Sequence, residues 1–174
     1  YKRQGCFKVG LYKQGLLHDM SKYSPTEFWV GAKYYQGTRS PNNAEREDIG
    51  YSSAWLHHKG RNKHHYEYWI DYSMQALPGG MAPVPMPDKY IAEMIMDRIA
   101  ASKVYMGDEY TDRSPLDYYY QGTDRAPIHP ETKAKLLYVL EMLAEEGEEK
   151  TFRFIKEELV QHKRCMDWHQ LEKA

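Results

Sequence analysis

Apolar residues recur along this chain mainly at the three-to-four-residue spacing of an α-helix, and the period-two alternation of a β-strand is hard to find. The segment from Asp88 to about Met106 shows the helical spacing most clearly, because its apolar positions share one face: Ile91, Met94, Ile95, Ile99 and Ala101. Similar stripes predict helices over roughly Cys6 to Tyr23, from Pro130 onward, and over Lys150 to His162. The pattern therefore predicts an all-α fold.

Capping and turn residues divide the rest of the N-terminal part. Ser24-Pro25-Thr26-Glu27 has the serine, proline and glutamate of a capping box, which predicts a helix from Pro25 to about Gln36 that ends at Gly37. The polar stretch from Thr38 to Gly50 predicts a surface loop. A short helix is expected next, over Ala54 to Lys59.

The middle of the chain is expected to hold one more helix and two loops. Asn62 is suited to cap a helix that runs through His64 to Tyr72. The segment from Leu77 to Pro87 contains four prolines and two glycines, which predicts a loop without regular structure that resembles a lid. A tyrosine-rich loop is expected between Met106 and Pro130.

Composition narrows the class of protein. The chain has 174 residues, of which 41% are hydrophobic and 28% charged, as in an ordinary globular domain. The formal net charge is −1, so neither nucleic acid nor an anionic membrane is an expected partner. Cys6 and Cys165 are too few for a disulfide framework, and no stretch reaches the ~20 apolar residues of a membrane span. We therefore expect one cytoplasmic domain over residues 1–174.

Histidines are concentrated in one part of the chain, because five of the eight lie between His18 and His65. On one continuous helix, His18, Asp19 and Lys22 would project into one sector. The adjacent pairs His57-His58 and His64-His65 follow, and we expect one member of each pair to face the site because neighbouring helical residues point ~100° apart. Imidazole and carboxylate groups together are typical ligands of divalent transition metals. The alternative for the first group is a surface ion pair between Asp19 and Lys22 beside a packed histidine.

Asp97 is a further candidate ligand. It lies on the apolar face of the predicted helix from Asp88 to Met106, where an ionised carboxylate is costly unless it is paired or bound to a metal. An ion pair with the neighbouring Arg98 is the alternative.

Three segments, LLHDMSK, WLHHKGRNKHH and MIMDRIAASKVY, resemble in order the motifs of the HD superfamily of metal-dependent phosphohydrolases, over roughly Leu16 to Tyr105. The resemblance implies a compact single-domain helical bundle of the HD-domain type, with a metal-site core at about residues 11–106 and C-terminal helices at 130–163 as scaffold. It also implies that His18, Asp19 and Asp97 bind metal. Lys22 corresponds to the lysine of the HDxGK variant.

The match to individual branches of that superfamily is incomplete. His57-His58 resembles the histidine pair of the branch that degrades cyclic dinucleotides, but the GYP element of that branch is absent. The superfamily has a histidine on a helix before the HD pair, whereas Tyr1 to Leu17 contains none, and we expect it to precede Tyr1. The string of motifs also resembles small bacterial and phage proteins, which supply no substrate.

These features lead to the hypothesis of a metal-dependent phosphohydrolase that acts on a nucleotide or another small phosphate ester through metal-activated water. One or two divalent ions, such as Mn, Fe or Mg, would be held by one set of residues: His18, Asp19, His57, His58 and Asp97. The phosphate would be bound by Lys22, Arg61 and His64. Lys22 would also act in catalysis, and His65 or a residue behind it would protonate the leaving group.

Two other functions fit the same residues. Some members of the superfamily use two irons to activate oxygen, and histidine-rich ligation suits iron, which makes a di-iron redox enzyme an alternative. A non-catalytic nucleotide-binding protein is the other, because 16 tyrosines and 4 tryptophans are available for stacking. The expected partner in each phosphate-binding case is a small phosphorylated ligand, and the sequence leaves homo-oligomerisation open.

Overall fold

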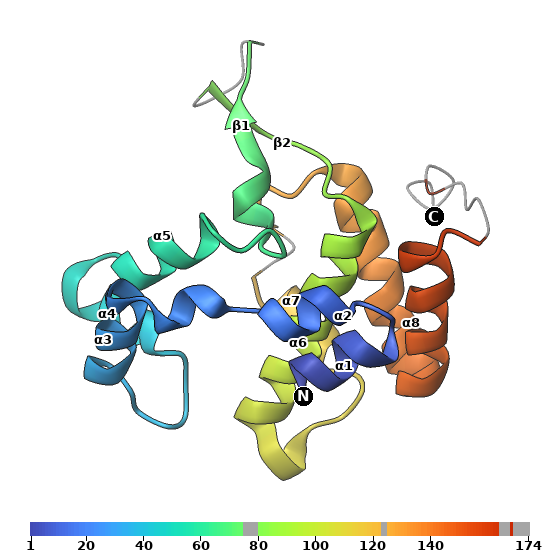
Figure 1. Ribbon diagram of the computed structural model, residues 1–174, viewed down its shortest axis with the longest axis horizontal. Helices are drawn as coiled ribbons and strands as arrows, with labels where there is room; N and C mark the ends of the chain where they lie inside the picture. The colour runs from blue at the N-terminus through green and yellow to red at the C-terminus, as the bar shows by residue number, and fades with distance from the viewer. Residues whose placement is uncertain (75–79, 123–124, 164–167, 169–174) are drawn as a thin grey trace.

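The computed structural model describes residues 1–74, 80–122, 125–163 and 168. Helices dominate it, and one two-stranded sheet is present among the described residues, so the mostly α-helical fold is confirmed (Figure 1). The α-helices are α1 (Lys2–Lys8), α2 (Tyr12–Leu17), α3 (Pro25–Lys33), α4 (Pro41–Ile49), α5 (Ser53–Lys59), α6 (Asp88–Met106), α7 (Ser114–Tyr120) and α8 (Pro130–Phe154). The shorter elements are η1 (Met20–Tyr23), η2 (Tyr66–Trp69), η4 (Gly107–Glu109), η6 (Ile155–Val160), β1 (Ile70–Tyr72) and β2 (Met81–Pro83).

The hydrophobic core lies around α6, against which α1, α7, α8 and η6 pack. Helix α6 occupies the predicted range, and its apolar face is buried because Ile91, Ile95 and Ile99 recur at the helical spacing. From α8, Leu136 and Leu140 are fully buried opposite them. Burial of one such side chain stabilises the fold by about 1.5–3 kcal/mol, so this face anchors the domain.

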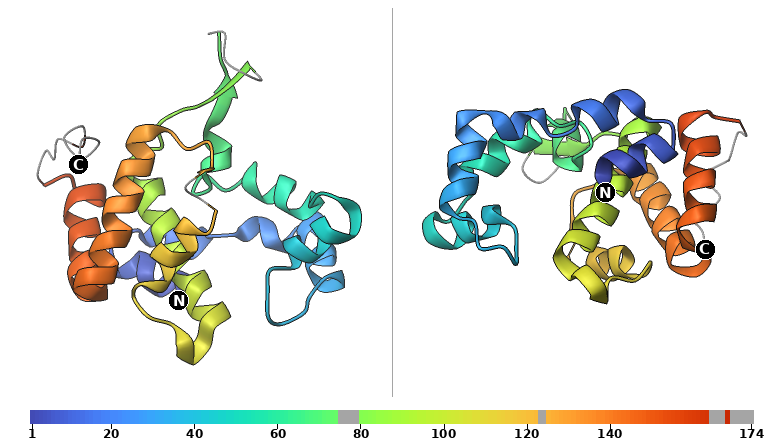
Figure 2. Two further views of the ribbon diagram at one scale, coloured as in Figure 1. Left: turned by 180° about the vertical axis from the view of Figure 1, so that it is seen from behind. Right: turned by 60° about the horizontal axis from the view of Figure 1, so that its bottom comes forward.

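Helices α3, α4 and α5 form an arm beside the core, on the side away from α8 (Figures 1 and 2). The predicted surface loop from Thr38 to Gly50 is wrong, because α4 occupies most of it. Pro41 stands at the start of α4, and Gly50 ends it with a left-handed φ of 85° that glycine adopts without strain. Only Ala44 and Glu45 of α4 are buried, so the polar composition of a surface helix resembled that of a loop.

The predicted helix from Cys6 to Tyr23 is divided into α1, α2 and the 3₁₀ turn η1. The first break is at Gly10, whose φ is +88°, and the second is at Asp19, whose φ is +55°. His18 and Asp19 therefore lie in the junction between α2 and η1, so the continuous helix from which a shared sector of His18, Asp19 and Lys22 was predicted is wrong.

An antiparallel hairpin projects from the fold between α5 and α6 (Figure 1). Strand β1 pairs with β2 in the register Ile70 to Pro83 and Tyr72 to Met81. The predicted helix through Tyr72 is wrong, because the short 3₁₀ turn η2 leads into β1 there. The predicted structureless segment from Leu77 to Pro87 is wrong in part, because it contains β2. The part of that segment at residues 75–79 lies outside the described residues.

The tyrosine-rich loop predicted between Met106 and Pro130 is wrong in part, because helical segments occupy much of its described residues. The tyrosine-rich stretch forms α7, which packs on α6 and α8. Two successive helices were expected after Pro130, and the structure shows α8 interrupted at Gly147, where φ is +79°, and followed by the π-helical segment η6. None of the helices in the described part of the chain combines the length and the apolar character that crossing a membrane requires.

Candidate metal centre

Asp19 is the residue on which the site converges. Its side chain is buried, and its left-handed backbone conformation costs of order 1–3 kcal/mol in a residue other than glycine. Nζ of Lys2 lies 3.1 Å from Oδ1 of this carboxylate, and Nζ of Lys22 lies 2.8 Å from its Oδ2. Burial alone would raise the pKa of Asp19, but the two ammonium groups outweigh it and hold the pKa well below its usual range. Asp19 is therefore an ionised carboxylate.

Two imidazoles present the same nitrogen to this carboxylate. His58 on α5 has Nδ1 2.8 Å from Oε2 of Glu27, and its Nε2 lies 3.7 Å from Oδ1 of Asp19. His64 repeats the arrangement, with Nδ1 3.1 Å from Oε1 of Glu93 and Nε2 3.5 Å from Oδ1 of Asp19. Because the Glu27 carboxylate accepts a hydrogen bond from His58, Nδ1 of that ring is assigned as the protonated nitrogen, which leaves the lone pair on Nε2, and the contact with Glu93 orients the His64 ring in the same direction. Metal-binding histidines are commonly held in this way.

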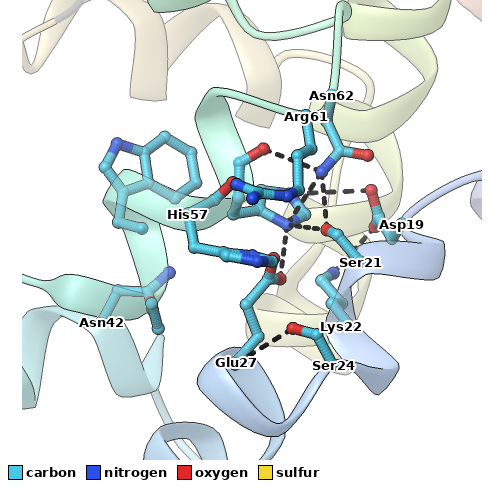
Figure 3. Close-up of polar contacts among 12 residues, drawn as sticks. Asp19, Ser21, Lys22, Ser24, Glu27, Asn42, His57, Arg61 and Asn62 are labelled. Atoms are coloured by element: carbon cyan, nitrogen blue, oxygen red, sulfur yellow. Dashed lines mark hydrogen bonds and ion pairs between the residues drawn. The ribbon is translucent and has the colours of Figure 1, made fainter.

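The Glu27 carboxylate accepts hydrogen bonds from more than one histidine, of which His57 is labelled in Figure 3. Its Oε1 accepts a hydrogen bond from Nδ1 of His57 at 2.6 Å. Asn62 adds to this side of the site by donating from Nδ2 to Oγ of Ser21 at 2.8 Å and to the carbonyl oxygen of His58 at 2.8 Å. These contacts fix the C-terminal end of α5 against η1 and so determine where His58 points.

The ammonium group of Lys2 lies between the carboxylates of Asp19 and Asp97 and the imidazole of His64. Nζ lies 3.1 Å from Oδ1 of Asp19, 3.1 Å from Oδ1 of Asp97 and 2.9 Å from Nε2 of His64. The residue is only 6% exposed. Burial alone would lower the pKa of Lys2, but Asp97 and Asp19 raise it overall, so the ammonium stays charged.

His65 completes the cluster from the edge of a cavity. One nitrogen from each of His58, His64 and His65 lies within 4.8 Å of the other two. Nε2 of His65 is buried and has no hydrogen-bond partner among the residues that the structure describes. Burial, with a further contribution from His64, lowers the pKa of His65 well below its ordinary value. His65 is therefore a neutral imidazole with a nitrogen available to bind a cation.

We call these five residues the His–Asp centre: Asp19, His58, His64, His65 and Asp97. The centre adjoins a cavity of about 1170 Å³ that is lined by residues of α3, α4, α5, α6 and α7, so it lies between the arm and the core. Asp19, His58, His65 and Asp97 reach its surface. Other parts of the wall carry aromatic rings from several elements: Phe28, Tyr35, Trp55, Tyr66, Tyr105 and Tyr118.

The structure separates the predicted metal ligands into two groups. Asp19, His58 and Asp97 come together in the His–Asp centre. His57 instead contacts Glu27, and Nδ1 of His18 lies 2.7 Å from the carbonyl oxygen of Gly15. Neither the His18 nor the His57 imidazole comes within 4.0 Å of a carboxylate of the centre among the described residues.

The predicted substrate-binding residues are also divided. Lys22 lines the cavity beside Asp19, as expected of a residue that contacts a ligand. Arg61 is exposed, donates to the carbonyl oxygen of His57 at 3.2 Å and is not part of the cavity wall. His64 is 2% exposed and belongs to the centre itself, so both members of the second histidine pair face the site rather than one.

Three residues of the site were missed by the sequence predictions: Lys2, Glu27 and Glu93. Lys2 carries no local signal, and it lies before the predicted metal-site core at residues 11–106. Glu27 fits the capping box, and its backbone N–H does donate to Oγ of Ser24 at 3.4 Å, but its carboxylate is turned toward the histidines. Glu93 had a detectable signal, since it lies one helical turn before Asp97 on the apolar face of α6.

Fold and site together define a mostly α-helical protein with a buried cluster of carboxylates and imidazoles at the edge of a large cavity. A profile of one protein family matches residues 3–142. The chain therefore belongs to this family, DUF5662, which is described as a family of unknown function. No curated protein and no solved structure matches the chain. The relationship to the HD superfamily stays a proposal that rests on the sequence motifs.

Proposed function

We propose that this protein is a metal-dependent phosphohydrolase of the HD type that acts on a nucleotide or another small phosphate ester. One observation carries the proposal. His58 and His64 are each held at Nδ1 by a buried carboxylate, so that both direct Nε2 toward Asp19. Each ring thus directs its second nitrogen, Nε2, into the site, where Nε2 of His64 already faces a cation, the Lys2 ammonium, at 2.9 Å.

The donor set fits a divalent transition metal. The His–Asp centre combines three imidazoles with two carboxylates, and such mixed N and O ligands suit Mn, Fe and related ions. The partnerless Nε2 of His65 supports the same assignment, because a buried polar atom without a partner is costly unless a ligand satisfies it. When bound, such an ion lowers the pKa of a bound water to supply the nucleophile and offsets negative charge on the phosphoryl oxygens.

The residues around the centre have distinct roles in this proposal. Lys22 has a 61% exposed side chain and lines the cavity, and its ammonium would contact an anionic phosphoryl oxygen next to the metal. His65 was a candidate to protonate the leaving group, but its lowered pKa keeps the ring neutral, and a neutral imidazole is a poor general acid, so we assign it to metal binding. The cavity of about 1170 Å³ exceeds the upper end of ordinary ligand sites, which span about 300–1,000 Å³, and therefore has room for a nucleotide.

The test compares the wild type with Asp19→Asn and with Asp48→Asn as a control on an exposed residue of α4. Tag-free proteins are analysed for bound metals and assayed with Mn²⁺ against nucleoside phosphates and p-nitrophenyl phosphate. We expect metal and hydrolysis in the wild type and in Asp48→Asn, and loss of both in Asp19→Asn. If the folded wild type binds no metal, or if Asp19→Asn hydrolyses the same substrates at the same rate, the proposal is refuted.

A di-iron redox enzyme is the second candidate, and the three imidazoles of the centre favour it, because histidine-rich sites suit iron. A Mössbauer spectrum of coupled iron, together with oxygen uptake and no phosphate release, would select this candidate. Nucleotide binding without turnover in any metal would instead select the non-catalytic binding protein. A cytoplasmic location, predicted from the cysteine content, belongs to the same set of proposals.

A further inference from the structure

Lys2 occupies the position at which the donors of the His–Asp centre converge. Its Nζ contacts Oδ1 of Asp19, Oδ1 of Asp97 and Nε2 of His64, all within 3.1 Å. Two carboxylate oxygens and one imidazole nitrogen are also the atoms that a divalent ion would use. The ammonium group is thus a cation that the chain itself supplies to a cation-binding site.

An ion and this ammonium group exclude each other for two reasons. A lone pair of His64 Nε2 that accepts a hydrogen bond from the Lys2 ammonium is not available to a metal. In addition, two cations within contact distance of the same carboxylates repel each other strongly at the low effective dielectric of a buried site. The space between the donors holds one cation or the other.

The long side chain of Lys2 makes displacement feasible. Its ammonium stands at the end of four methylene groups, and Asp19 and Asp97, which it contacts, line the cavity, so a change of side-chain rotamers can carry the ammonium toward solvent while α1 stays packed on α6. Lys22 differs from Lys2 in this respect, since its Nζ contacts Oδ2 of Asp19 and not the Oδ1 that faces the imidazoles. Displacement therefore concerns one side chain.

We propose that Lys2 is a tethered competitor of the metal, which fills the His–Asp centre when the ion is absent and leaves when the ion binds. The inference rests on the proposed function, because it requires that the centre binds metal. It assigns Lys2 two effects. It stabilises the metal-free protein by neutralising Asp19 and Asp97, and it weakens the apparent affinity for the ion by the free energy needed to displace it.

The first experiment measures Mn²⁺ binding by isothermal titration calorimetry to the wild type, Lys2→Met and Arg3→Met. Arg3 is an exposed cation on the same helix and controls for net charge. Displacement breaks at least one charge-assisted hydrogen bond, so we expect Lys2→Met to bind Mn²⁺ about tenfold more tightly or better, and Arg3→Met to bind like the wild type. Equal or weaker binding by Lys2→Met overturns the inference.

A second experiment uses the wild type alone, in case Lys2→Met does not fold without metal. Acetylation of Lys2 by an amine-reactive ester is followed by peptide mass spectrometry with and without saturating Mn²⁺. We expect slow labelling of Lys2 without the ion and faster labelling with it, whereas Lys135, which is buried against Asp88 and Glu131, stays slow in both. Labelling of Lys2 that does not change on Mn²⁺ saturation overturns the inference.

The results also separate this inference from the proposed function. If the wild type binds Mn²⁺ and Lys2→Met binds no better, only the competitor role is wrong. If the wild type binds no Mn²⁺ but Lys2→Met does, the competitor role is supported in its strongest form. If neither binds the ion, both the metal centre and the role of Lys2 are refuted.

Discussion

Glu27 accepts hydrogen bonds from two imidazoles at once, which makes its replacement an informative test of how the centre is oriented. Its carboxylate oxygens lie 2.6 Å from Nδ1 of His57 and 2.8 Å from Nδ1 of His58. In Glu27→Ala, His58 loses the acceptor that keeps its proton on Nδ1 and its lone pair on Nε2. Loss of such a partner behind a metal ligand typically weakens metal binding about 10- to 100-fold, and we expect a loss in this range for Mn²⁺.

The effect on stability follows from the same contacts. A hydrogen bond to a charged group contributes about 1.5–3 kcal/mol, and Glu27 makes two. Oγ of Ser21 lies 3.1 Å from Nδ1 of His58 and, as a neutral and weaker acceptor, offsets only part of the loss, so we expect the free energy of unfolding to fall by about 1.5–3 kcal/mol rather than twice that. Glu27→Gln keeps one acceptor oxygen and should be intermediate in both measurements.

The assay combines calorimetric titration with Mn²⁺ and urea unfolding of the metal-free proteins. Glu47→Ala is the control, because Glu47 is an exposed glutamate of α4 that pairs with Arg39 at the surface, and it should leave the Mn²⁺ affinity unchanged. If a folded Glu27→Ala variant binds Mn²⁺ with wild-type affinity, the Glu27 carboxylate does not orient His58 for metal binding, and this prediction is refuted.

Three further predictions concern the core, a thiol and the pH dependence. Leu140→Ala should lower the free energy of unfolding in urea by about 2–5 kcal/mol because Leu140 is fully buried, whereas Leu16→Ala, at a 62% exposed residue, should change it by less than about 0.5 kcal/mol; equal effects would contradict the assigned core. Burial raises the pKa of Cys6 to about 12, so iodoacetamide at pH 8 should label Cys6 in urea but not in the native protein, as peptide mass spectrometry would show. The pKa of Asp19 is lowered on folding, so its contribution to stability is present above the unfolded pKa near 3.8 and is lost as the pH falls toward the lower folded value. The urea midpoint of the metal-free wild type should therefore fall more steeply between pH 5 and pH 3, about one unit either side of that pKa, than the midpoint of Asp19→Asn. Parallel curves for the two proteins would refute this prediction.

The elements that were predicted correctly share a strong local signal. Helix α6 has apolar residues at every turn, and its bounds at Asp88 and Met106 agree with the prediction. The start of α3 at Pro25 was also predicted, because serine, proline and glutamate act on the backbone within one turn. Both signals depend on residues that are close in sequence, which is why they survive without knowledge of the rest of the fold.

The elements that were predicted wrongly depend on context. Helix α4 has few apolar residues because only one narrow side of it is covered, so its composition resembled that of a loop. The short strands β1 and β2 stabilise each other across a connection, and neither has enough residues to show an alternating pattern. The break at Asp19 requires a left-handed backbone conformation, which the buried contacts of Asp19 maintain. No glycine or proline next to Asp19 indicates this break in the sequence.

The sequence by itself determined the helical class, the apolar face of α6 and the set of residue types that could bind a metal, because periodicity and clustering are properties of neighbouring positions. Tertiary structure alone decided which nitrogen of each imidazole is available and which cation stands among the donors. Glu27 and His58 are 31 positions apart, and Lys2 and His64 are 62 apart. Such pairs meet only because α1 packs on α6 and α3 on α5, and no local pattern records where two packed helices bring their side chains together.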